Sequence, residues 1–233
     1  MISRYTYGSC IETGAVPEKP EIEAGAPPFF VVDEEQMTLT YRMAEHDRVY
    51  GLGENLRGIN KRGWIYESKC TDDPNHMEEK RSLYAAHNFF VVDGSETFGV
   101  FVDYPGIVSF DIGYTKMEEL KIQASDWNLD VYVITGMDVK DIVKQFRKMI
   151  GRSYIPPLWA FGYGQSRWGY RSEDDVREVV KAYRDLQIPL DSVYLDIDYM
   201  ERYKDFTLNQ ETFPDFPDFV EEMKKENIHL VPI

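Results

Sequence analysis

Residues 156–200 constrain the fold of this chain more than any other stretch, because they read as strand, loop, helix and strand. Residues 159–163 form an apolar and aromatic run behind two prolines, which predicts a buried strand. Ser172 offers an N-cap followed by acidic residues, which predicts a helix that ends near Pro189. Residues 193–195 predict a second strand. A helical connection between two buried neighbouring strands indicates a parallel pair, as in an α/β fold.

Two loops follow the carboxyl ends of these strands, where parallel α/β proteins bind their ligands. The first loop, 165–170, presents Arg167 and Trp168, and the second presents Asp196 and Asp198. An indole stacks on the C–H face of a sugar, while carboxylates and a guanidinium hold hydroxyl groups. These side chains therefore predict a sugar-binding site. The alternative, that the tryptophan belongs to the core and the acids face water, stays open at this point.

Most of the chain before residue 138 reads as short strands separated by turns. Prolines interrupt residues 1–28, which predict an irregular lead-in. The predicted strands are 29–32, 37–43, 48–54, 64–66, 89–92, 98–102, 107–112 and 129–134. Such a series is typical of a β-sandwich. One amphipathic helix, capped by Asp138 and ended by Gly151, closes a predicted N-terminal β-sandwich domain of residues 1–151.

Residues 152–233 predict the start of a (β/α)8 TIM barrel. After the second strand come a predicted helix over 219–226 and a third strand over 228–233. A complete barrel requires about 250 residues, and a sheet of three parallel strands leaves an open edge. We therefore expect a truncated barrel, in a chain that is the front part of a longer protein.

Composition excludes several classes of partner. The chain has 41 acidic and 26 basic side chains, a formal net charge of -15, which argues against nucleic acid or an anionic membrane as partner. There is no signal-peptide pattern and no run of about eighteen apolar residues, so a cytoplasmic protein is expected. Cys10 and Cys70 provide no disulfide framework, and His76 lacks the spaced partners of a metal site. We expect neither metal nor cofactor.

An ordered set of segments resembles one enzyme family. The segments are VYGLGE at 49–54, the loop at Asp72, FGVF at 98–101, RSYIPPLWA at 152–160, QSRWGY at 165–170, DIDYM at 196–200, DFT at 205–207 and FP at 213–214. Across nearly the whole chain they resemble the N-terminal third of an α-glucosidase of glycoside hydrolase family 31, of the bacterial gut type. The resemblance implies a β-sandwich followed by a (β/α)8 barrel, in agreement with the pattern of strands and helices.

The resemblance also implies an exo-acting enzyme that hydrolyses terminal α-linked glucose with retention, through a nucleophile and an acid/base carboxyl group. In the family both groups lie further along the barrel, the nucleophile in a Trp-x-Asp-Met-Asn-Glu-like segment that is absent here. The chain alone is therefore expected to be inactive. Asp196 and Asp198 would share one side of a strand with roughly 6.5–7 Å between their α-carbons, but the resemblance makes neither of them catalytic.

Three of the four substrate-binding residues that the resemblance implies lie in the barrel. Asp196 is expected to hold hydroxyl groups of the nonreducing-end sugar, with Ile197 packed beside it, while Asp198 is expected to be a structural acid. Trp168 stands where the family varies its aromatic residue, so it should shape the site for the leaving sugar. Our hypothesis is that its indole favours α-1,6 over α-1,4 linkages.

The fourth residue, Asp72, lies in the sandwich. It matches a loop aspartate that reaches toward the leaving-group side of the barrel mouth. Its neighbour Asp73 would take this role if the match slipped by one position. An ordinary Asx-turn before Pro74 is the alternative for both.

Two other functions stay open. One is an α-xylosidase or transglucosidase of the same family, and the other is a non-catalytic carbohydrate-binding module with a vestigial tail. The expected partner of the enzyme is an α-glucoside oligosaccharide. The sequence leaves open the natural oligosaccharide and the oligomeric state, a homo-oligomer included.

Overall fold

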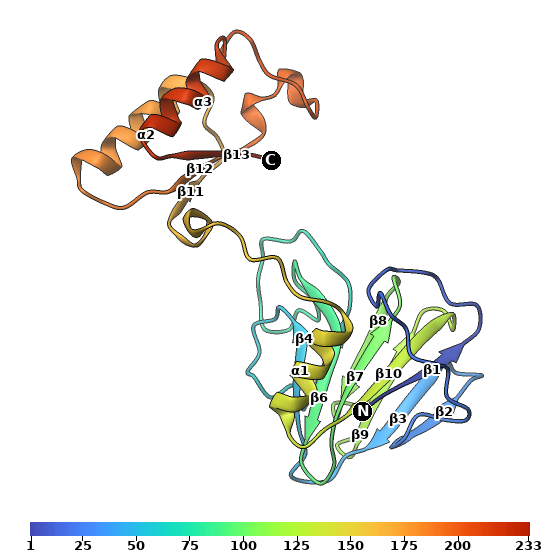
Figure 1. Ribbon diagram of the computed structural model, residues 1–233. Helices are drawn as coiled ribbons and strands as arrows, with labels where there is room; N and C mark the ends of the chain where they lie inside the picture. The colour runs from blue at the N-terminus through green and yellow to red at the C-terminus, as the bar shows by residue number, and fades with distance from the viewer. The chain divides into compact units, whose positions relative to one another are not determined.

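The computed structural model describes residues 1–233, which divide into two compact units, Met1–Arg152 and Ser153–Ile233 (Figure 1). The first unit is built from strands and one α-helix, and the second alternates strands with helices. Each unit has its own hydrophobic core. None of the α-helices combines the length and the apolarity that crossing a membrane requires.

The first unit is a β-sandwich, which confirms the predicted fold. Its elements are β1 (Ile2–Tyr7), β2 (Phe30–Asp33), β3 (Thr38–Arg42), β4 (Arg48–Gly53), β5 (Trp64–Glu67), β6 (Ala86–Asp93), β7 (Thr97–Asp103), β8 (Val108–Ile112), β9 (Glu119–Ala124), β10 (Leu129–Thr135) and α1 (Val139–Met149). They form two five-stranded sheets, in the orders β1-β10-β7-β6-β4 and β2-β3-β9-β8-β5. All neighbouring strands in both sheets are antiparallel.

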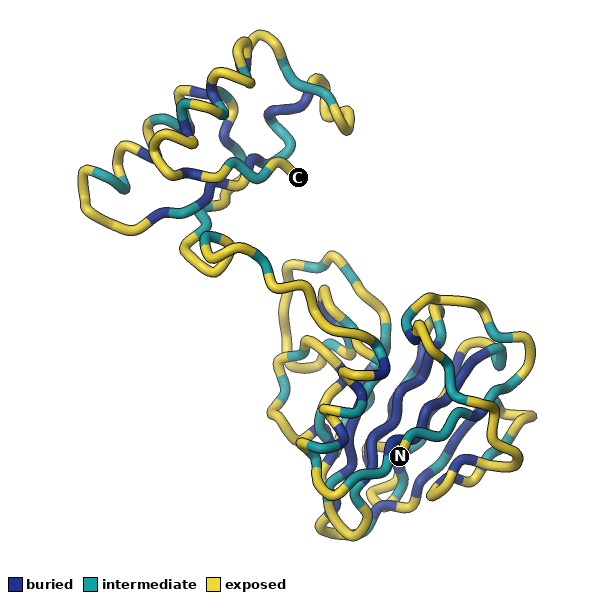
Figure 2. Tube along the Cα trace, viewed as in Figure 1, coloured by how far each residue is buried: buried dark blue, intermediate teal, exposed yellow.

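Successive side chains of the central strands point to opposite faces of the first sheet, and each face is covered by a hydrophobic core. In β7, Phe98 and Val100 belong to the main core of the sandwich, whereas Phe101 packs with helix α1. Phe146 of α1 stacks on Phe89 of β6, with ring centroids 3.8 Å apart. Figure 2 shows the buried residues concentrated in these strands. Because both faces are covered, the central strands read as continuous apolar runs rather than as an alternating pattern.

Two strands of the sandwich were absent from the predicted set. Residues 2–7, expected to be irregular, form β1 and pair with β10. Arg4 and Thr6 face Asp130 of β10, so apolar alternation does not mark this strand in the sequence. Strand β9 carries Leu120 and Ile122 inward between charged and polar residues that also suit a helix. In both cases the pairing partner, rather than local propensity, decides the conformation.

The second unit is the predicted beginning of a parallel barrel. Its elements are η1 (Leu158–Phe161), β11 (Gly164–Ser166), α2 (Glu173–Asp185), β12 (Ser192–Leu195), η2 (Ile197–Tyr199), η3 (Glu201–Tyr203), α3 (Phe216–Lys225) and β13 (His229–Pro232), where η denotes a 3₁₀ helix. The strands are parallel in the order β11-β12-β13. Figure 1 shows α2 and α3 on the same face of this sheet. Val176 and Val180 of α2 pack there with Val193 and Leu195 of β12.

The predicted strand over 159–163 is wrong. Leu158–Phe161 forms the 3₁₀ helix η1, and the strand begins only at Gly164. Backbone hydrogen bonds from Ala160 to Pro157 and from Gly162 to Trp159 close the turns of η1. Only residues 164–166 find a strand partner, in β12. An apolar run therefore forms a strand only where another strand completes its hydrogen bonds.

Ser172 caps helix α2 as predicted, since its Oγ accepts a hydrogen bond from the backbone N–H of Asp175 at 3.2 Å. Ser172→Ala is expected to destabilise α2 by about 1 kcal/mol, because this N–H loses its acceptor. Hydrogen–deuterium exchange of the α2 amides measures the effect. Ser172→Asp keeps an acceptor and should stay within about 0.5 kcal/mol of the unmodified chain. Equal losses in the two variants would contradict the capping role.

Candidate functional site

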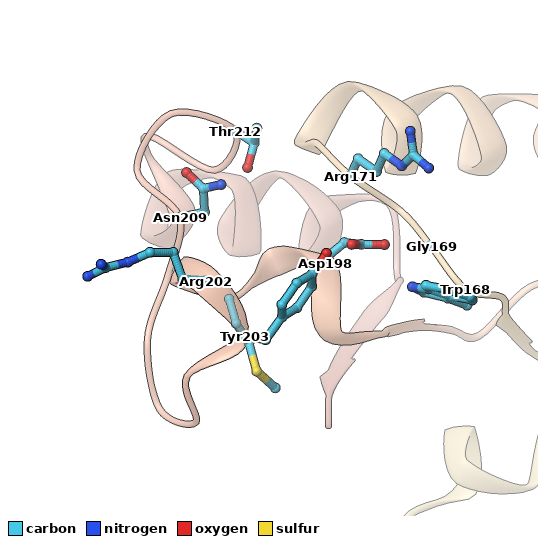
Figure 3. Close-up of a pocket in the computed structure, with 9 residues that line it drawn as sticks. Trp168, Gly169, Arg171, Asp198, Arg202, Tyr203, Asn209 and Thr212 are labelled. Carbon is cyan, nitrogen blue, oxygen red and sulfur yellow. The ribbon is translucent and has the colours of Figure 1, made fainter.

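A cavity of about 590 Å³ lies beside the loops that follow β11 and β12 in the second unit (Figure 3). These loops leave the carboxyl ends of parallel strands, which is the ligand-binding side of a barrel. The lining residues are Trp168, Gly169, Arg171, Asp198, Met200, Arg202, Tyr203, Asn209 and Thr212. The cavity therefore combines two aromatic rings, one carboxylate and several groups that can donate hydrogen bonds.

The aromatic rings are accessible, and the carboxylate lies between them. The side chains of Trp168 and Tyr203 are 73% and 63% exposed. Figure 3 shows the half-buried Asp198 with its carboxylate directed toward the Trp168–Gly169 segment, whose peptide bond is cis. The guanidinium groups of Arg171 and Arg202 point away from this carboxylate. The centre of the cavity is thus suited to a neutral polyhydroxylated ligand that stacks on an exposed ring.

Asp196 and Ile197 do not line this cavity. Asp196 is the N-cap of η2, and its carboxylate accepts a hydrogen bond from the N–H of Ile197 at 2.7 Å. The expectation that Asp196 and Asp198 share one side of a strand is wrong, because β12 ends at Leu195 and the chain turns into η2. The structure thus brings Trp168 together with Asp198, the acid that was expected to be structural.

Sequence reasoning also missed the polar side of the cavity. Asn209 and Thr212 come from the irregular segment between η3 and α3. The Oγ of Thr212 is buried without a hydrogen-bond partner. A polar loop after the second predicted strand was the only signal for these residues, and loop positions have no periodicity that would indicate their direction. Arg167, which the sequence grouped with Trp168, lies outside this cavity.

The loop that carries Asp72 belongs to the first unit, and its two aspartates differ. Asp73 pairs with Lys80 and accepts a hydrogen bond from the N–H of Asn75 at 2.9 Å, which is an Asx-turn. The hydrogen bond from Lys80, followed by that from Asn75, lowers the pKa of Asp73. Asp72 is exposed. Burial, followed by the interaction with Asp72, raises the pKa of Tyr84. The Asx-turn interpretation therefore fits Asp73, whereas Asp72 is exposed beside Tyr84.

Other chemistry-bearing side chains do not form a second centre. Nowhere in residues 1–233 do three or more His, Cys, Asp or Glu side chains converge in a way that could hold a metal ion. Cys10 and Cys70 are both free thiols. The ring of His76 packs edge-on against Tyr84, with centroids 5.3 Å apart.

A β-sandwich, followed by parallel strands with a cavity beside their carboxyl-end loops, defines the chain as part of a sandwich-and-barrel protein. Residues 28–111 match the glycosyl hydrolase 31 N-terminal galactose mutarotase-like domain. Residues 153–233 match the glycosyl hydrolases family 31 TIM-barrel domain. The chain belongs to glycoside hydrolase family 31, which confirms the resemblance.

Several relatives with assigned names are α-glucosidases. The chain is 36% identical over 193 residues to alpha-glucosidase 2 of Bacillus thermoamyloliquefaciens, covering 82% of this chain and 24% of that protein. It is 32% identical over 202 residues to the lysosomal alpha-glucosidase of Mus musculus, covering 85% of this chain and 21% of that protein. The chain thus spans less than a quarter of the length of either relative.

Solved structures share the same fold. The family 31 dextranase of Flavobacterium johnsoniae, complexed with glucose, superimposes with a TM-score of 0.78 at 25% identity, over 89% of this chain and 25% of that one. A mutant of the same dextranase is complexed with isomaltotriose. The glucosidase II alpha subunit superimposes with a TM-score of 0.73 at 22% identity, over 84% of this chain and 24% of that one.

Proposed function

We propose that this chain is the N-terminal part of an exo-acting, retaining α-glucosidase that hydrolyses terminal α-linked glucose from oligosaccharides. The observation that carries the proposal is the 36% identity over 193 residues to an α-glucosidase, an alignment longer than either unit of the chain. The nucleophile and the acid/base would lie in the part of the relatives that this chain does not span. The chain supplies sugar contacts but not the two bond-breaking carboxyl groups.

In this proposal the binding residues divide the substrate between them. Asp196 holds hydroxyl groups of the terminal glucose, and Ile197 forms an apolar wall beside it. Trp168 packs against the leaving sugar, and Asp72 is the fourth residue assigned to substrate binding. The exposed indole in a cavity with a carboxylate supports the assignment of Trp168. Asp73 already binds Lys80 and the N–H of Asn75, which favours its neighbour Asp72 for the substrate. Such contacts speed the reaction only where they tighten in the transition state.

The experiment that tests the proposal compares the 233-residue chain with a full-length protein that contains it. We expect the full-length protein to release glucose from maltose and isomaltose and to cleave nitrophenyl α-glucoside, whereas the chain alone releases none. Faster cleavage of nitrophenyl α-xyloside would show an α-xylosidase, and glucosyl transfer to acceptor sugars would show a transglucosidase. Sugar binding without turnover by the full-length protein would show a carbohydrate-binding module. Each of these results would overturn the proposal.

We further propose that Trp168 favours α-1,6 linkages. The similar dextranase that is complexed with isomaltotriose, an α-1,6-linked trisaccharide, supports a ligand of this linkage on the shared fold. Trp168→Tyr in the full-length protein is expected to lower the ratio of kcat/KM for isomaltose to that for maltose by about tenfold. A change of packing surface against one sugar is worth about 1–3 kcal/mol. Trp127→Tyr, a matched change in the sandwich, should leave the ratio unchanged. An unaltered ratio in Trp168→Tyr would remove the linkage hypothesis.

A further inference from the structure

The loops after β11 and β12 meet at Gly169 and Asp198. A Cβ atom at position 169 would lie 2.9 Å from Cγ and 3.5 Å from Cβ of Asp198, and closer still to its carboxylate. The first separation is shorter than Cβ atoms tolerate, so a methyl group at position 169 would displace the Asp198 side chain. The absence of a Cβ at Gly169 therefore lets Asp198 pack this closely, next to the indole-bearing residue.

The contact lies where the backbone of Trp168 has few other restraints. Trp168 itself is 73% exposed, so its own side chain packs little within the second unit. Two residues later, Tyr170 is 4% exposed and belongs to the core with Val176 and Tyr199. Between this buried anchor and the exposed indole, the Asp198 side chain fills the space beside Gly169. The Asp198 side chain, which comes from the neighbouring loop, therefore lies where it could restrain this segment.

Asp198 also belongs to the same 3₁₀ turn as the residue proposed to hold the terminal glucose. Asp196 caps η2, and Asp198 is the central residue of that turn. The single turn therefore carries an acid assigned to the terminal sugar and an acid that packs against Gly169, next to the aromatic residue assigned to the leaving sugar. A shift of η2 moves both together.

We propose that Asp198 is a positioning residue that fixes the Trp168–Gly169 segment and, through the indole, the choice between linkages. This inference rests on the proposed function, and it assigns to Asp198 no contact with the reacting atoms. It predicts that shortening the Asp198 side chain and adding a methyl group at Gly169 disturb the same indole. It also predicts that Asp198→Asn, which keeps the shape of the side chain, retains most of the effect, because packing rather than charge holds the segment.

The contact is tested in the 233-residue chain itself, without any activity. The chain has four tryptophans, so 19F NMR of 5-fluorotryptophan-labelled protein gives four resonances, and Trp168→Phe identifies one of them. Asp198→Ala and Gly169→Ala are expected to shift the Trp168 resonance and to leave those of Trp64 and Trp127 in place. Asp218→Ala, a matched change at an exposed site in helix α3, should shift none. A Trp168 resonance that stays unchanged in both Asp198→Ala and Gly169→Ala overturns the proposal.

The consequence for specificity is tested by a double-mutant cycle in the full-length protein. Asp198→Ala is expected to lower the isomaltose-to-maltose ratio of kcat/KM about as far as Trp168→Ala does, and the double variant no further than Trp168→Ala alone. Asp198→Asn should stay within about twofold of the unmodified ratio. The positioning role would be overturned if Asp198→Ala lowered kcat/KM equally for both disaccharides and if this loss added to that of Trp168→Ala in the double variant. The proposed function would still stand. The absence of α-glucosidase activity in the unmodified full-length protein would refute the proposed function. The NMR experiment would then still test the contact between Asp198 and the Trp168–Gly169 segment.

Discussion

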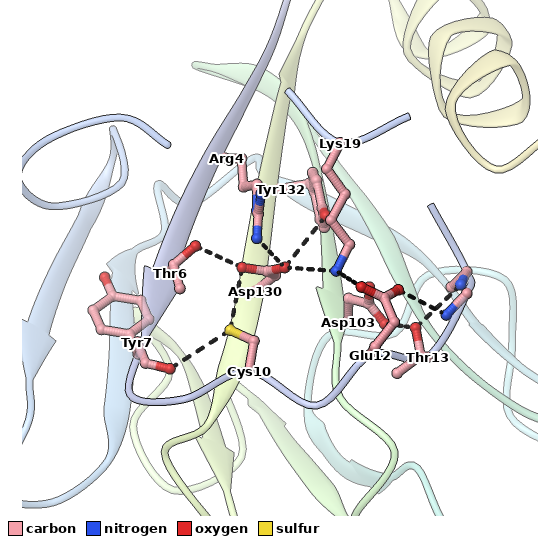
Figure 4. Close-up of polar contacts among 12 residues, drawn as sticks. Arg4, Thr6, Tyr7, Cys10, Glu12, Thr13, Lys19, Asp103, Asp130 and Tyr132 are labelled. Atoms are coloured by element: carbon pink, nitrogen blue, oxygen red, sulfur yellow. Dashed lines mark hydrogen bonds and ion pairs between the residues drawn. The ribbon is translucent and has the colours of Figure 1, made fainter. Parts of the chain in front are cut away.

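Replacing Asp130 with alanine is expected to lower the free energy of unfolding of the sandwich by about 3 kcal/mol, because the change leaves the partly buried guanidinium of Arg4 without its acid. The side chain of Asp130 is 1% exposed and that of Arg4 is 15% exposed, and their charged groups lie 2.9 Å apart. The Asp130 carboxylate also accepts hydrogen bonds from Thr6 at 2.6 Å and from the thiol of Cys10 at 3.3 Å (Figure 4). Without this acid, Arg4 and Thr6 lose their acceptor in the interior.

Asp103 supplies a matched control from the neighbouring strand. It pairs directly with Asp130 in the register of β7 and β10, and it is also buried. Its carboxylate accepts a hydrogen bond from Thr13 at 2.6 Å, but its second oxygen has no partner. Asp103→Asn removes a like charge and keeps an acceptor for Thr13, so stability at neutral pH should change by no more than about 1 kcal/mol, in either direction.

The stabilities that Asp130 and Asp103 contribute to the sandwich are expected to respond to pH in opposite directions. Burial would raise the pKa of Asp130, but the hydrogen bonds from Arg4, Thr6 and Cys10 outweigh burial and lower it. The stability that this group contributes is therefore present above the ordinary aspartate pKa of about 3.9 and is lost as the pH falls through the lowered value. Burial raises the pKa of Asp103 despite the hydrogen bond from Thr13, so this group becomes less unfavourable as the pH falls through the raised value.

Urea denaturation of the 233-residue chain at several pH values, read at the transition of the sandwich, measures these effects. The cost of Asp130→Ala should be largest near neutral pH and should shrink below about pH 4. On acidification, the free energy of unfolding of Asp103→Asn should fall relative to that of the unmodified chain, since only the aspartate gains stability from protonation. Asp126→Ala, at an exposed turn, should change the free energy little. Equal costs for Asp130→Ala and Asp103→Asn would contradict this account of the cluster.

Asp196→Ala in the full-length protein is expected to reduce kcat/KM for maltose and isomaltose by about 10²–10³-fold. Hydrogen bonds to a charged acceptor are worth about 1.5–3 kcal/mol each, and the proposal assigns to Asp196 more than one hydroxyl of the terminal sugar. Both substrates present that sugar identically, so their ratio should stay constant. This separates Asp196 from Trp168, whose replacement should change the ratio.

Steady-state kinetics on the two disaccharides measures this prediction, with Asp174→Ala as control. Asp174 is an exposed acid in the first turn of α2, and its contact is an ion pair with Arg177, so its loss should leave kcat/KM within about twofold. The proposed role of Asp196 fails if Asp196→Ala keeps kcat/KM on either disaccharide. It also fails if only the discrimination between linkages changes.

The fold could be predicted from the sequence wherever a local pattern has one physical solution. Phe98 and Val100 belong to a buried run between turns, and Ser172 and Asp138 are capping residues before apolar periodicity, so strand β7 and helices α2 and α1 were predicted. Strand β1 could not be predicted, because its inward-facing Arg4 is polar and is matched only by Asp130 on the paired strand β10. Trp159 belongs to an aromatic run that suggested a strand, but the chain forms η1 there.

The candidate site was predictable as a place but not as a geometry. The order of strands and loops located Trp168, Asp196 and Asp198 at the carboxyl ends of parallel strands. A strand-like spacing could not show that η2 begins at Ile197. It also could not show that Asp198, rather than Asp196, shares a cavity with Trp168.

The sequence by itself determined the sandwich, the parallel strands that follow it and the family, because periodicity, caps and motifs are local properties of the chain. Only the tertiary structure decided which acid packs against Gly169 beside the indole, which aspartate of the Asp72–Asp73 pair forms an ion pair with Lys80, and that Asp130 pairs with Arg4. These contacts join residues that are separated along the chain, and some depend on a turn that sets the direction of a side chain. Their geometry follows from packing and pairing between elements rather than from the preference of any one segment.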